Sequence, residues 1–270
     1  MSYKEALTNY GIKAILALHL ESTVRGFNRL MRRAAARSHH LEFLLDWGGY
    51  RKPPEWFDHL TDQYWRWHVT RNPMSWERGV FATLAMPQGG RVLDLCCGGG
   101  FIPYHFYAGR AAAVLAVDFD PAAIAHAQKN FQAPNLEFRC ADIRSAMPAG
   151  PFDTIVWNAA IEHFTDVEIT ALLSAIKQRL CSTGILAGYT IVERADGKSH
   201  PDHEYEFTSK EDLARVLRPY FKHVTVFETR WQDMFEERRN LYFYASDAPV
   251  PFDESWPQQL RVGDAAVSAG

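Results

Sequence analysis

The sequence predicts an α/β protein with a doubly wound, seven-stranded and mostly parallel sheet, an antiparallel edge strand and an N-terminal helical cap. Three observations carry this prediction. From Arg91 onward, short apolar runs alternate with helical patterns. A glycine-rich turn follows the first apolar run, and Asp118 closes the second. The region before Arg91 is aromatic-rich and helical in pattern, which predicts the cap.

Seven apolar runs have the length and composition of buried strands. They span residues 91–95, 113–117, 136–139, 153–157, 184–192, 223–228 and 240–245. Helical patterns separate them at 101–109, 121–131, 166–181 and 209–219, the last with Thr208 or Ser209 as its N-cap. The connection from Trp231 to Arg239 is too short for a crossover helix, so the last two strands are expected to pair antiparallel.

A turn-forming cluster at 86–90 marks a domain boundary. Residues 1–85 are expected to form the helical cap or lid, beginning with a helix over 1–37. Residues 86–248 are expected to form a Rossmann-like domain, and 249–270 a flexible tail. Four arginines share one face of the first helix: Arg25, Arg29, Arg32 and Arg33. They form either a solvated surface or a docking site for an anion or partner.

Composition excludes several classes of protein. The 270 residues are 47% hydrophobic, enough to bury a core, so disorder is not the main state. A formal net charge of -3 gives no sign of a nucleic-acid or anionic-membrane partner. No run approaches the roughly 18 apolar residues of a membrane-spanning helix, and no signal peptide is seen. The four cysteines lack zinc-site spacing, so reduced thiols in a cytoplasmic protein are expected.

The segment Val92–Gly100 carries the clearest chemical signal. It is a strand that ends in a glycine-rich turn, where backbone N–H groups can approach a ligand closely. A dinucleotide fingerprint beginning at Gly98 would need a glycine where Pro103 stands, so NAD is disfavoured. The adjacent Cys96 and Cys97 have no evident base beside them and are interpreted as small packing residues.

Three further segments follow later strands. Asp118 lies at the distance where nucleoside-binding α/β folds hold both ribose hydroxyls with one carboxylate. After the third strand, Asp142 can accept from an adenine amine while Ile143 packs on the ring. The fourth strand ends at Asn158. All of these positions lie where the carboxyl ends of parallel strands form a crevice.

This series resembles the class I S-adenosylmethionine-dependent methyltransferases over roughly residues 60–245. The resemblance implies S-adenosylmethionine as cofactor, with Asp94 and the turn holding its methionine part. The turn residues are Cys96, Cys97, Gly98 and Gly100, with Cys96 where the family has its first glycine. The resemblance further implies that Asp118 binds the ribose, that Phe119 flanks the adenine, and that Asp142 and Ile143 recognise it. Asn158 would lie beside the transferring methyl group.

The methyl acceptor is less well specified by the sequence. His163, which follows Glu162, is the first candidate general base for an acceptor hydroxyl, although the pair could instead cap or orient the next helix. The pair looks like one in the quinone-biosynthesis O-methyltransferases, whose metal site includes a further Glu. Ala159 occupies that position here, so no metal is predicted.

Candidate acceptor-binding residues come from two segments. His200, His203 and Tyr205 follow the fifth strand and are expected over the crevice, with loop polarity as the alternative. His200 and His203 with Glu204 are reminiscent of a metal cluster, but the sequence identifies no further ligand. In related enzymes an N-terminal helical segment covers the cofactor, so Tyr64 and Trp67 in the cap could fold over the same crevice.

Three functions stay open at this point. The first is methyl transfer to a hydroxyl oxygen of a small molecule, the second is N-methylation of an amine or protein, and the third is S-adenosylmethionine binding without catalysis. A nucleic-acid acceptor is disfavoured by the charge balance and by the absence of an Asn-Pro-Pro-Tyr-type motif after the fourth strand. The oligomeric state is open, with a homodimer through the N-terminal helices as one arrangement.

Overall fold

The computed structural model describes residues 3–47, 71, 73–193, 197–198, 202–232 and 237–256. The chain divides into two compact units. The first contains α1 (Tyr3–Ala17) and α2 (Glu21–Trp47), and the second contains every described element from α4 onward. Among the helices in these described ranges, none combines the length and apolarity that a bilayer-crossing helix needs.

The helix expected over 1–37 is interrupted in the structure. His19 adopts a φ of 52° between α1 and α2, a left-handed conformation that an uninterrupted α-helix does not allow. The four arginines of the predicted stripe all belong to α2 and are exposed. Exposure is compatible with both a solvated surface and a docking site, so both interpretations stay predictions.

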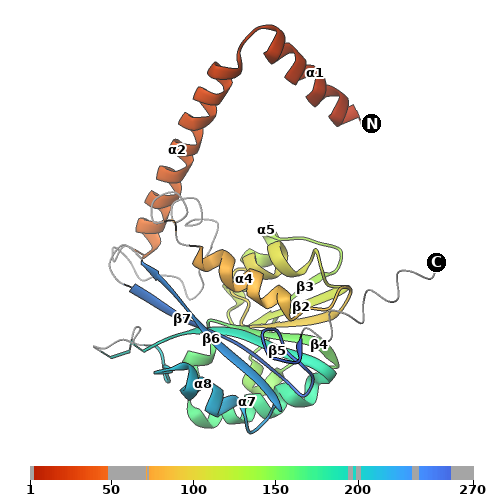
Figure 1. Cartoon of the computed structure of the whole chain (residues 1–270), viewed down its shortest axis with the longest axis vertical. Coiled ribbons are helices and arrows are strands. Elements are labelled where there is room, and N and C mark those ends of the chain that lie inside the picture. The colour runs from red at the N-terminus through yellow and green to blue at the C-terminus, as the bar shows by residue number, and fades with distance from the viewer. Residues whose placement is uncertain are drawn as a thin grey trace, which may run out of the picture. The chain divides into compact units, whose positions relative to one another are not determined.

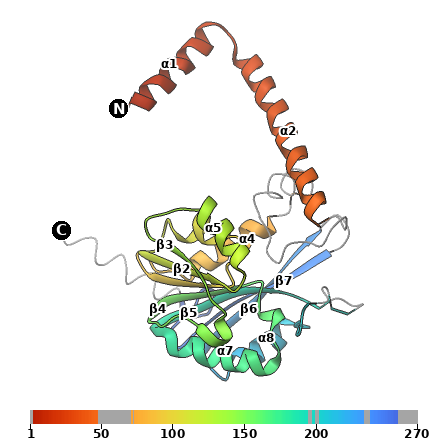
Figure 2. The ribbon, with the colours of Figure 1, turned by 180° about the vertical axis from the view of Figure 1, so that it is seen from behind.

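The second unit is built on one seven-stranded sheet, as predicted (Figures 1 and 2). Its strands are β1 (Arg91–Leu95), β2 (Ala113–Asp118), β3 (Leu136–Cys140), β4 (Phe152–Asn158), β5 (Leu180–Ile191), β6 (His223–Gln232) and β7 (Glu237–Ser246). Their spatial order is β3-β2-β1-β4-β5-β7-β6. The first five strands pair in parallel, and β7 pairs antiparallel with both β5 and β6. The antiparallel pairing at this edge is thus confirmed, and the reversed strand is β7, next to the edge strand β6.

Helices cover both faces of the sheet (Figure 2). On one face lie α4 (Met74–Leu84), η2 (Pro103–Tyr107) and α5 (Pro121–Asn130). On the other lie α7 (Asp166–Arg179) and α8 (Lys210–Leu217). Two short helices, α6 (Ile143–Ala146) and η3 (Ile161–His163), follow β3 and β4. Ser209 caps α8 by accepting from the Asp212 N–H at 3.2 Å, as the sequence predicts.

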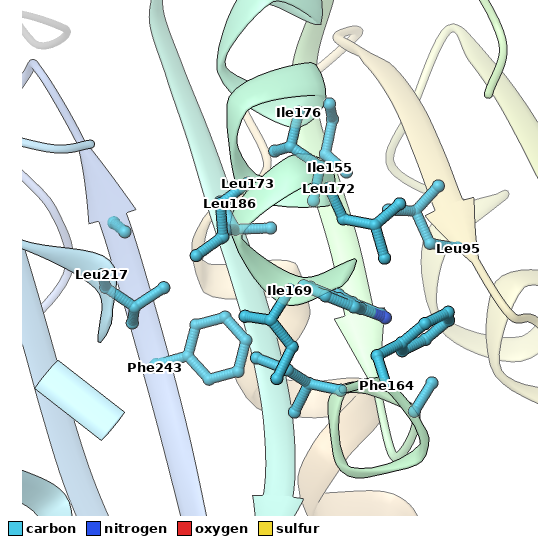
Figure 3. Packing of buried hydrophobic residues seen from close by; sticks show 14 of the residues in the cluster. Leu95, Ile155, Phe164, Ile169, Leu172, Leu173, Ile176, Leu186, Leu217 and Phe243 are labelled. Carbon is cyan, nitrogen blue, oxygen red and sulfur yellow. The ribbon is translucent and has the colours of Figure 1, made fainter. Parts of the chain in front are cut away.

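The central strands β1 and β4 are largely apolar on both faces because each is buried between two helical layers. Along β1, Val92 packs toward α5 while Leu93 and Leu95 pack toward α7. Along β4, Val156 belongs to the core cluster on the α5 side and Ile155 to the core cluster on the α7 side. Figure 3 shows the cluster on the α7 side, here called the α7-side core, with Leu172 and other side chains of α7 against the sheet. This alternation follows from the two-residue period of a strand.

Two predicted elements differ in detail. The helix expected at 101–109 is largely a π-helix, in which the Ala108 N–H reaches the carbonyl of Pro103 at 3.0 Å. The segment expected to be a flexible tail is packed over its first eight residues, since Val250 is fully buried. Asp253 there accepts hydrogen bonds from Ser255 and Trp256 backbone N–H groups at 2.8 and 2.9 Å, which fix the turn.

Gly100 is expected to tolerate alanine poorly. Its φ of +84° is left-handed, and a Cβ would lie 2.7 Å from the Ala127 Cβ and 2.8 Å from the Phe138 ring. Gly100→Ala should therefore lower the free energy of unfolding by about 2–4 kcal/mol, combining backbone strain with overpacking. Gly89→Ala is the matched control because Gly89 has a φ of +74° with nothing within 4 Å. In denaturant unfolding the control should lose only about 1 kcal/mol of its free energy of unfolding. Equal losses in both variants would show that the close approach of the new Cβ to Ala127 and Phe138 is unimportant.

Candidate active site

The turn after β1 is held against the end of β2. Cys96, Gly98 and Gly100 adopt left-handed φ values of 58°, 54° and 84°. The Cys97 N–H donates to the carbonyl of Val117 at 2.9 Å, and the Gly98 N–H donates to a carboxylate oxygen of Asp118 at 2.8 Å. The turn predicted from the glycines therefore forms at the carboxyl ends of β1 and β2, where hydrogen bonds join it to β2.

Cys96 takes up the backbone conformation of the glycine it replaces. Its left-handed φ is unfavourable for a residue with a Cβ. Its side chain packs against the α7-side core, and burial raises the pKa of the Cys96 and Cys97 thiols well above their ordinary value. Neutral thiols are weak nucleophiles, which supports the interpretation of both residues as packing residues.

Cys96→Gly is expected to leave cofactor affinity unchanged and to alter the free energy of unfolding by less than about 1 kcal/mol. Relief of about 1–2 kcal/mol of left-handed strain is offset by lost side-chain burial and by the greater freedom of glycine in the unfolded chain. Cys96→Val, β-branched at the same φ, should be clearly destabilising. Unfolding curves and cofactor titration check both variants, and loss of cofactor binding in Cys96→Gly would show instead that the thiol contacts the ligand.

Asp118 connects the turn to the following loop. It is 7% exposed, and its two carboxylate oxygens accept from the Gly98 N–H and from the Asp120 N–H at 3.0 Å. Burial raises its pKa, and the two backbone hydrogen bonds oppose that rise. Phe119, the next residue, is 60% exposed. The roles of Asp118 toward the ribose and of Phe119 toward the adenine stay predictions.

Asp94 lies beneath the turn with a charged neighbour that the sequence analysis did not identify. Its side chain is 3% exposed, and its pKa is raised well above the ordinary value by burial and by Asp118. Arg78 on α4 lowers that pKa, and its guanidinium lies 5.8 Å from the ring centre of Tyr189. Arg78 is itself only 9% exposed. The sequence around Arg78, with Glu77 beside it, resembles any amphipathic helix and gave no signal for this contact.

Asp142 and Ile143 lie after β3 but already have protein partners. Asp142 caps α6, and its carboxylate accepts from the Arg144 side chain at 2.8 Å, which holds the pKa of Asp142 below its usual range. Ile143 is 4% exposed and belongs to the α7-side core. Their roles toward adenine stay predictions, and recognition by Asp142 would require its carboxylate to be shared with Arg144.

Asn158 and Ala159 form the end of β4. The Asn158 amide donates to the Tyr107 hydroxyl at 3.0 Å, which connects β4 to η2. Ala159 has a left-handed φ of 50°, and its N–H donates to the carbonyl of Tyr189 at 2.8 Å. This sharp turn directs the chain into η3, which carries Glu162 and His163.

The structure brings His203 to the Glu162–His163 pair. Glu162 is 3% exposed, and its carboxylate accepts from the Thr190 hydroxyl at 3.0 Å. The rings of His163 and His203 lie edge to face, with centres 4.7 Å apart. Backbone N–H groups of Glu204 and Tyr205 donate to the Glu162 carbonyl at 2.9 and 3.1 Å, so the loop lies directly on η3.

The remaining predicted acceptor residues divide into two groups. The Tyr205 hydroxyl donates to Asp212 on α8 at 3.3 Å, and its ring packs against Phe207. These contacts fix Tyr205 on the loop at α8, and they leave its acceptor-binding role a prediction. Tyr64, Trp67 and His200 lie outside the described residues.

Comparisons with known proteins agree with this geometry. Residues 92–184 match the family described as a methyltransferase domain. A malonyl-[acyl-carrier protein] O-methyltransferase of Acetivibrio thermocellus is 30% identical over 114 residues, which cover 42% of this chain and 40% of that protein. An uncharacterized methyltransferase of Mycobacterium bovis is 35% identical over 102 residues, 37% of this chain and 50% of its own length. The chain thus matches half or less of each of these relatives.

Solved structures share the fold. The N-methyltransferase NodS from Bradyrhizobium japonicum superposes with a TM-score of 0.53 at 18% identity, covering 65% of this chain and 98% of that one. A putative methyltransferase from Bacillus halodurans gives a TM-score of 0.52 at 13% identity, covering 63% and 98%. The sheet order and these structures show the fold that such methyltransferases share, and residues 92–184 match a methyltransferase domain. The part of the chain that matches the family itself runs from Val92 in β1 to Gly184 in β5.

Proposed function

We propose that this protein transfers the methyl group of S-adenosylmethionine to a hydroxyl oxygen of a small-molecule acceptor. The observation that carries the proposal is the Glu162–His163 pair, held directly after the β4 turn and joined there by His203. An acceptor hydroxyl must lose a proton during transfer, and imidazole and carboxylate groups are suited to assist that loss. Asn158, the last residue of β4, would lie between the bound cofactor and these three side chains.

The cofactor would lie across the carboxyl ends of β1 and β2. Asp118 would accept from the ribose hydroxyls, Phe119 would flank the adenine, and the turn from Cys96 to Gly100 would approach the methionine part. Asp94 and Arg78 place a buried carboxyl group and a buried guanidinium group near that turn. Such a pair is complementary to the ammonium and carboxylate groups of an amino acid, so we add Arg78 to the cofactor-binding residues.

Methyl transfer mainly requires that the acceptor atom be aligned with the S–CH₃ bond. The acceptor oxygen attacks the methyl carbon as the S–CH₃ bond breaks, the sulfur leaves as S-adenosylhomocysteine, and the hydroxyl proton passes to a base or to water. The Acetivibrio relative is an O-methyltransferase by name, which favours oxygen as the acceptor atom. All four cysteines are free, which accords with our placing the reaction in the cytoplasm.

A paired acceptor screen tests the choice of oxygen. Release of S-adenosylhomocysteine would be measured from the full chain with small hydroxyl compounds and with amines matched to them in carbon skeleton. Turnover with hydroxyl compounds alone is the expected result. Turnover with amines alone would replace the proposal by N-methylation, and cofactor binding without turnover on any acceptor would indicate a regulatory protein.

A further inference from the structure

We propose that Glu162, His163 and His203 bind a divalent transition-metal ion of the Zn²⁺ type. One potential ligand atom from each of the three side chains lies within 4.8 Å of the other two. Bonds of about 2.0–2.2 Å from nitrogen and oxygen to zinc require these atoms to converge slightly when the ion binds. The sequence analysis excluded a metal because Ala159 replaces a ligand seen in related enzymes, but it did not place His203 here.

The hydrogen bonds around the two imidazoles are those that metal-binding histidines make. The Nδ1 atom of His163 lies 3.2 Å from the carbonyl oxygen of Asp202, and the Nδ1 atom of His203 lies against the Glu206 carboxylate. A neutral imidazole that donates from Nδ1 carries its lone pair on Nε2, the atom that would bind the ion. Partners of this kind fix the tautomer and the ring orientation of metal ligands.

The carboxylate ligand is also fixed by the fold. Glu162 is buried, and Thr190 on β5 donates to its Oε2 atom at 3.0 Å. Burying a carboxylate costs free energy unless its charge is compensated. The Thr190 hydroxyl is a neutral donor and does not supply that compensation. A cation between Glu162 and the two imidazoles would provide that compensation.

Backbone contacts set the distance between the two segments that supply the ligands. Besides the two N–H groups that donate to the Glu162 carbonyl, the Lys198 ammonium donates to the carbonyls of His203 and Glu204, both at 2.8 Å. His203 is 8% exposed, whereas His163 is exposed. The ligands therefore come from a fixed loop and a fixed turn, with one side open.

The donor set selects the ion. Two imidazoles and one carboxylate suit zinc and neighbouring transition metals, whereas Mg²⁺ prefers an octahedron of oxygen atoms. Three protein ligands leave a coordination position for a further oxygen, as in catalytic zinc sites. An acceptor hydroxyl bound there would lose its proton to water more readily and would attack the methyl carbon as an alkoxide. This catalytic role rests on the proposed methyl transfer, but the binding of the ion does not.

Cobalt binding tests the site directly, because Co²⁺ replaces Zn²⁺ and absorbs visible light according to its ligands. The full chain, stripped with a chelator, would be titrated with Co²⁺ and then with Zn²⁺ and Mg²⁺ as competitors. We expect one Co²⁺ to bind per chain, and we expect Zn²⁺ to displace it while the same concentration of Mg²⁺ does not. His163→Ala, His203→Asn and Glu162→Gln should each bind Co²⁺ at least about 10-fold more weakly.

The matched control is His223→Gln. His223 begins the edge strand β6, where its Nδ1 lies 3.1 Å from Asp253. Since β6 runs in the same direction as β4, His223 lies at the end of the sheet opposite the carboxyl ends of β1 and β4. It should bind Co²⁺ like the unchanged protein. His163→Ala is the decisive variant because an exposed side chain can be removed without unfolding the chain, and circular dichroism would verify the fold of all variants.

Absence of Co²⁺ and Zn²⁺ binding by the unchanged chain would overturn the inference, as would equal affinity in folded His163→Ala. Titration of the same preparations with S-adenosylmethionine separates the two proposals. Metal binding without cofactor binding would refute the methyltransferase function alone. Cofactor binding and turnover without metal binding would refute the metal site alone.

Discussion

Asp118→Asn is expected to weaken S-adenosylmethionine binding by about 100-fold or more. Hydrogen bonds to a charged acceptor contribute about 1.5–3 kcal/mol each, and the ribose would lose the ionised partner of both hydroxyls. The substitution also changes the turn, since the new amide group has only one acceptor oxygen for the N–H groups of Gly98 and Asp120. Isothermal titration calorimetry with purified variants measures the loss.

Asp120→Asn is the matched control for that experiment. Asp120 lies two residues away and caps α5 by accepting from the Ala122 N–H at 2.8 Å. Asparagine caps helices about as well, so the control should keep both its stability and its cofactor affinity. If Asp118→Asn bound the cofactor as tightly as this control, the ribose site would have to lie elsewhere.

His163→Ala is expected to reduce turnover with a hydroxyl acceptor by about 100-fold or more, while cofactor affinity changes little. The loss has the same sign whether the imidazole takes the acceptor proton itself or holds an ion that makes the proton more acidic. The side chain is exposed, so stability should be nearly unchanged. Initial rates of S-adenosylhomocysteine formation at saturating cofactor measure the effect, with His223→Gln as the reference variant.

Retention of full turnover by His163→Ala would be incompatible with a role in proton removal. It would instead favour a neutral amine as the acceptor, since such a nucleophile attacks without losing a proton first. The metal titration then becomes informative on its own, because a bound ion with no kinetic effect would be structural.

Much of the fold follows from local sequence patterns. The central strands β1 and β4 are largely apolar because helices cover both faces of the sheet there, so their runs could be located within a few residues, as β1 shows. The short connection before β7 predicted its antiparallel pairing correctly. The glycines after β1 predicted the turn, and Asp118 closes β2 where expected.

The features that were missed depend on contacts between distant segments. His203 meets Glu162 only because the loop after β5 folds back onto η3, and no spacing within the loop indicates that contact. Arg78 is buried because α4 packs on the sheet beside Asp94, whereas its sequence neighbours resemble any amphipathic helix. The π-helix at Pro103–Tyr107 and the left-handed His19 between α1 and α2 are backbone conformations that the sequence patterns described above do not indicate.

Titration of the unchanged full chain with S-adenosylmethionine and with S-adenosylhomocysteine is the most direct test of the methyltransferase function. Micromolar binding of both compounds, at one site per chain and lost in Asp118→Asn, is the predicted result. Absence of binding by a chain shown to be folded would contradict it, and the left-handed Cys96 in the turn after β1 would be the first feature to re-examine.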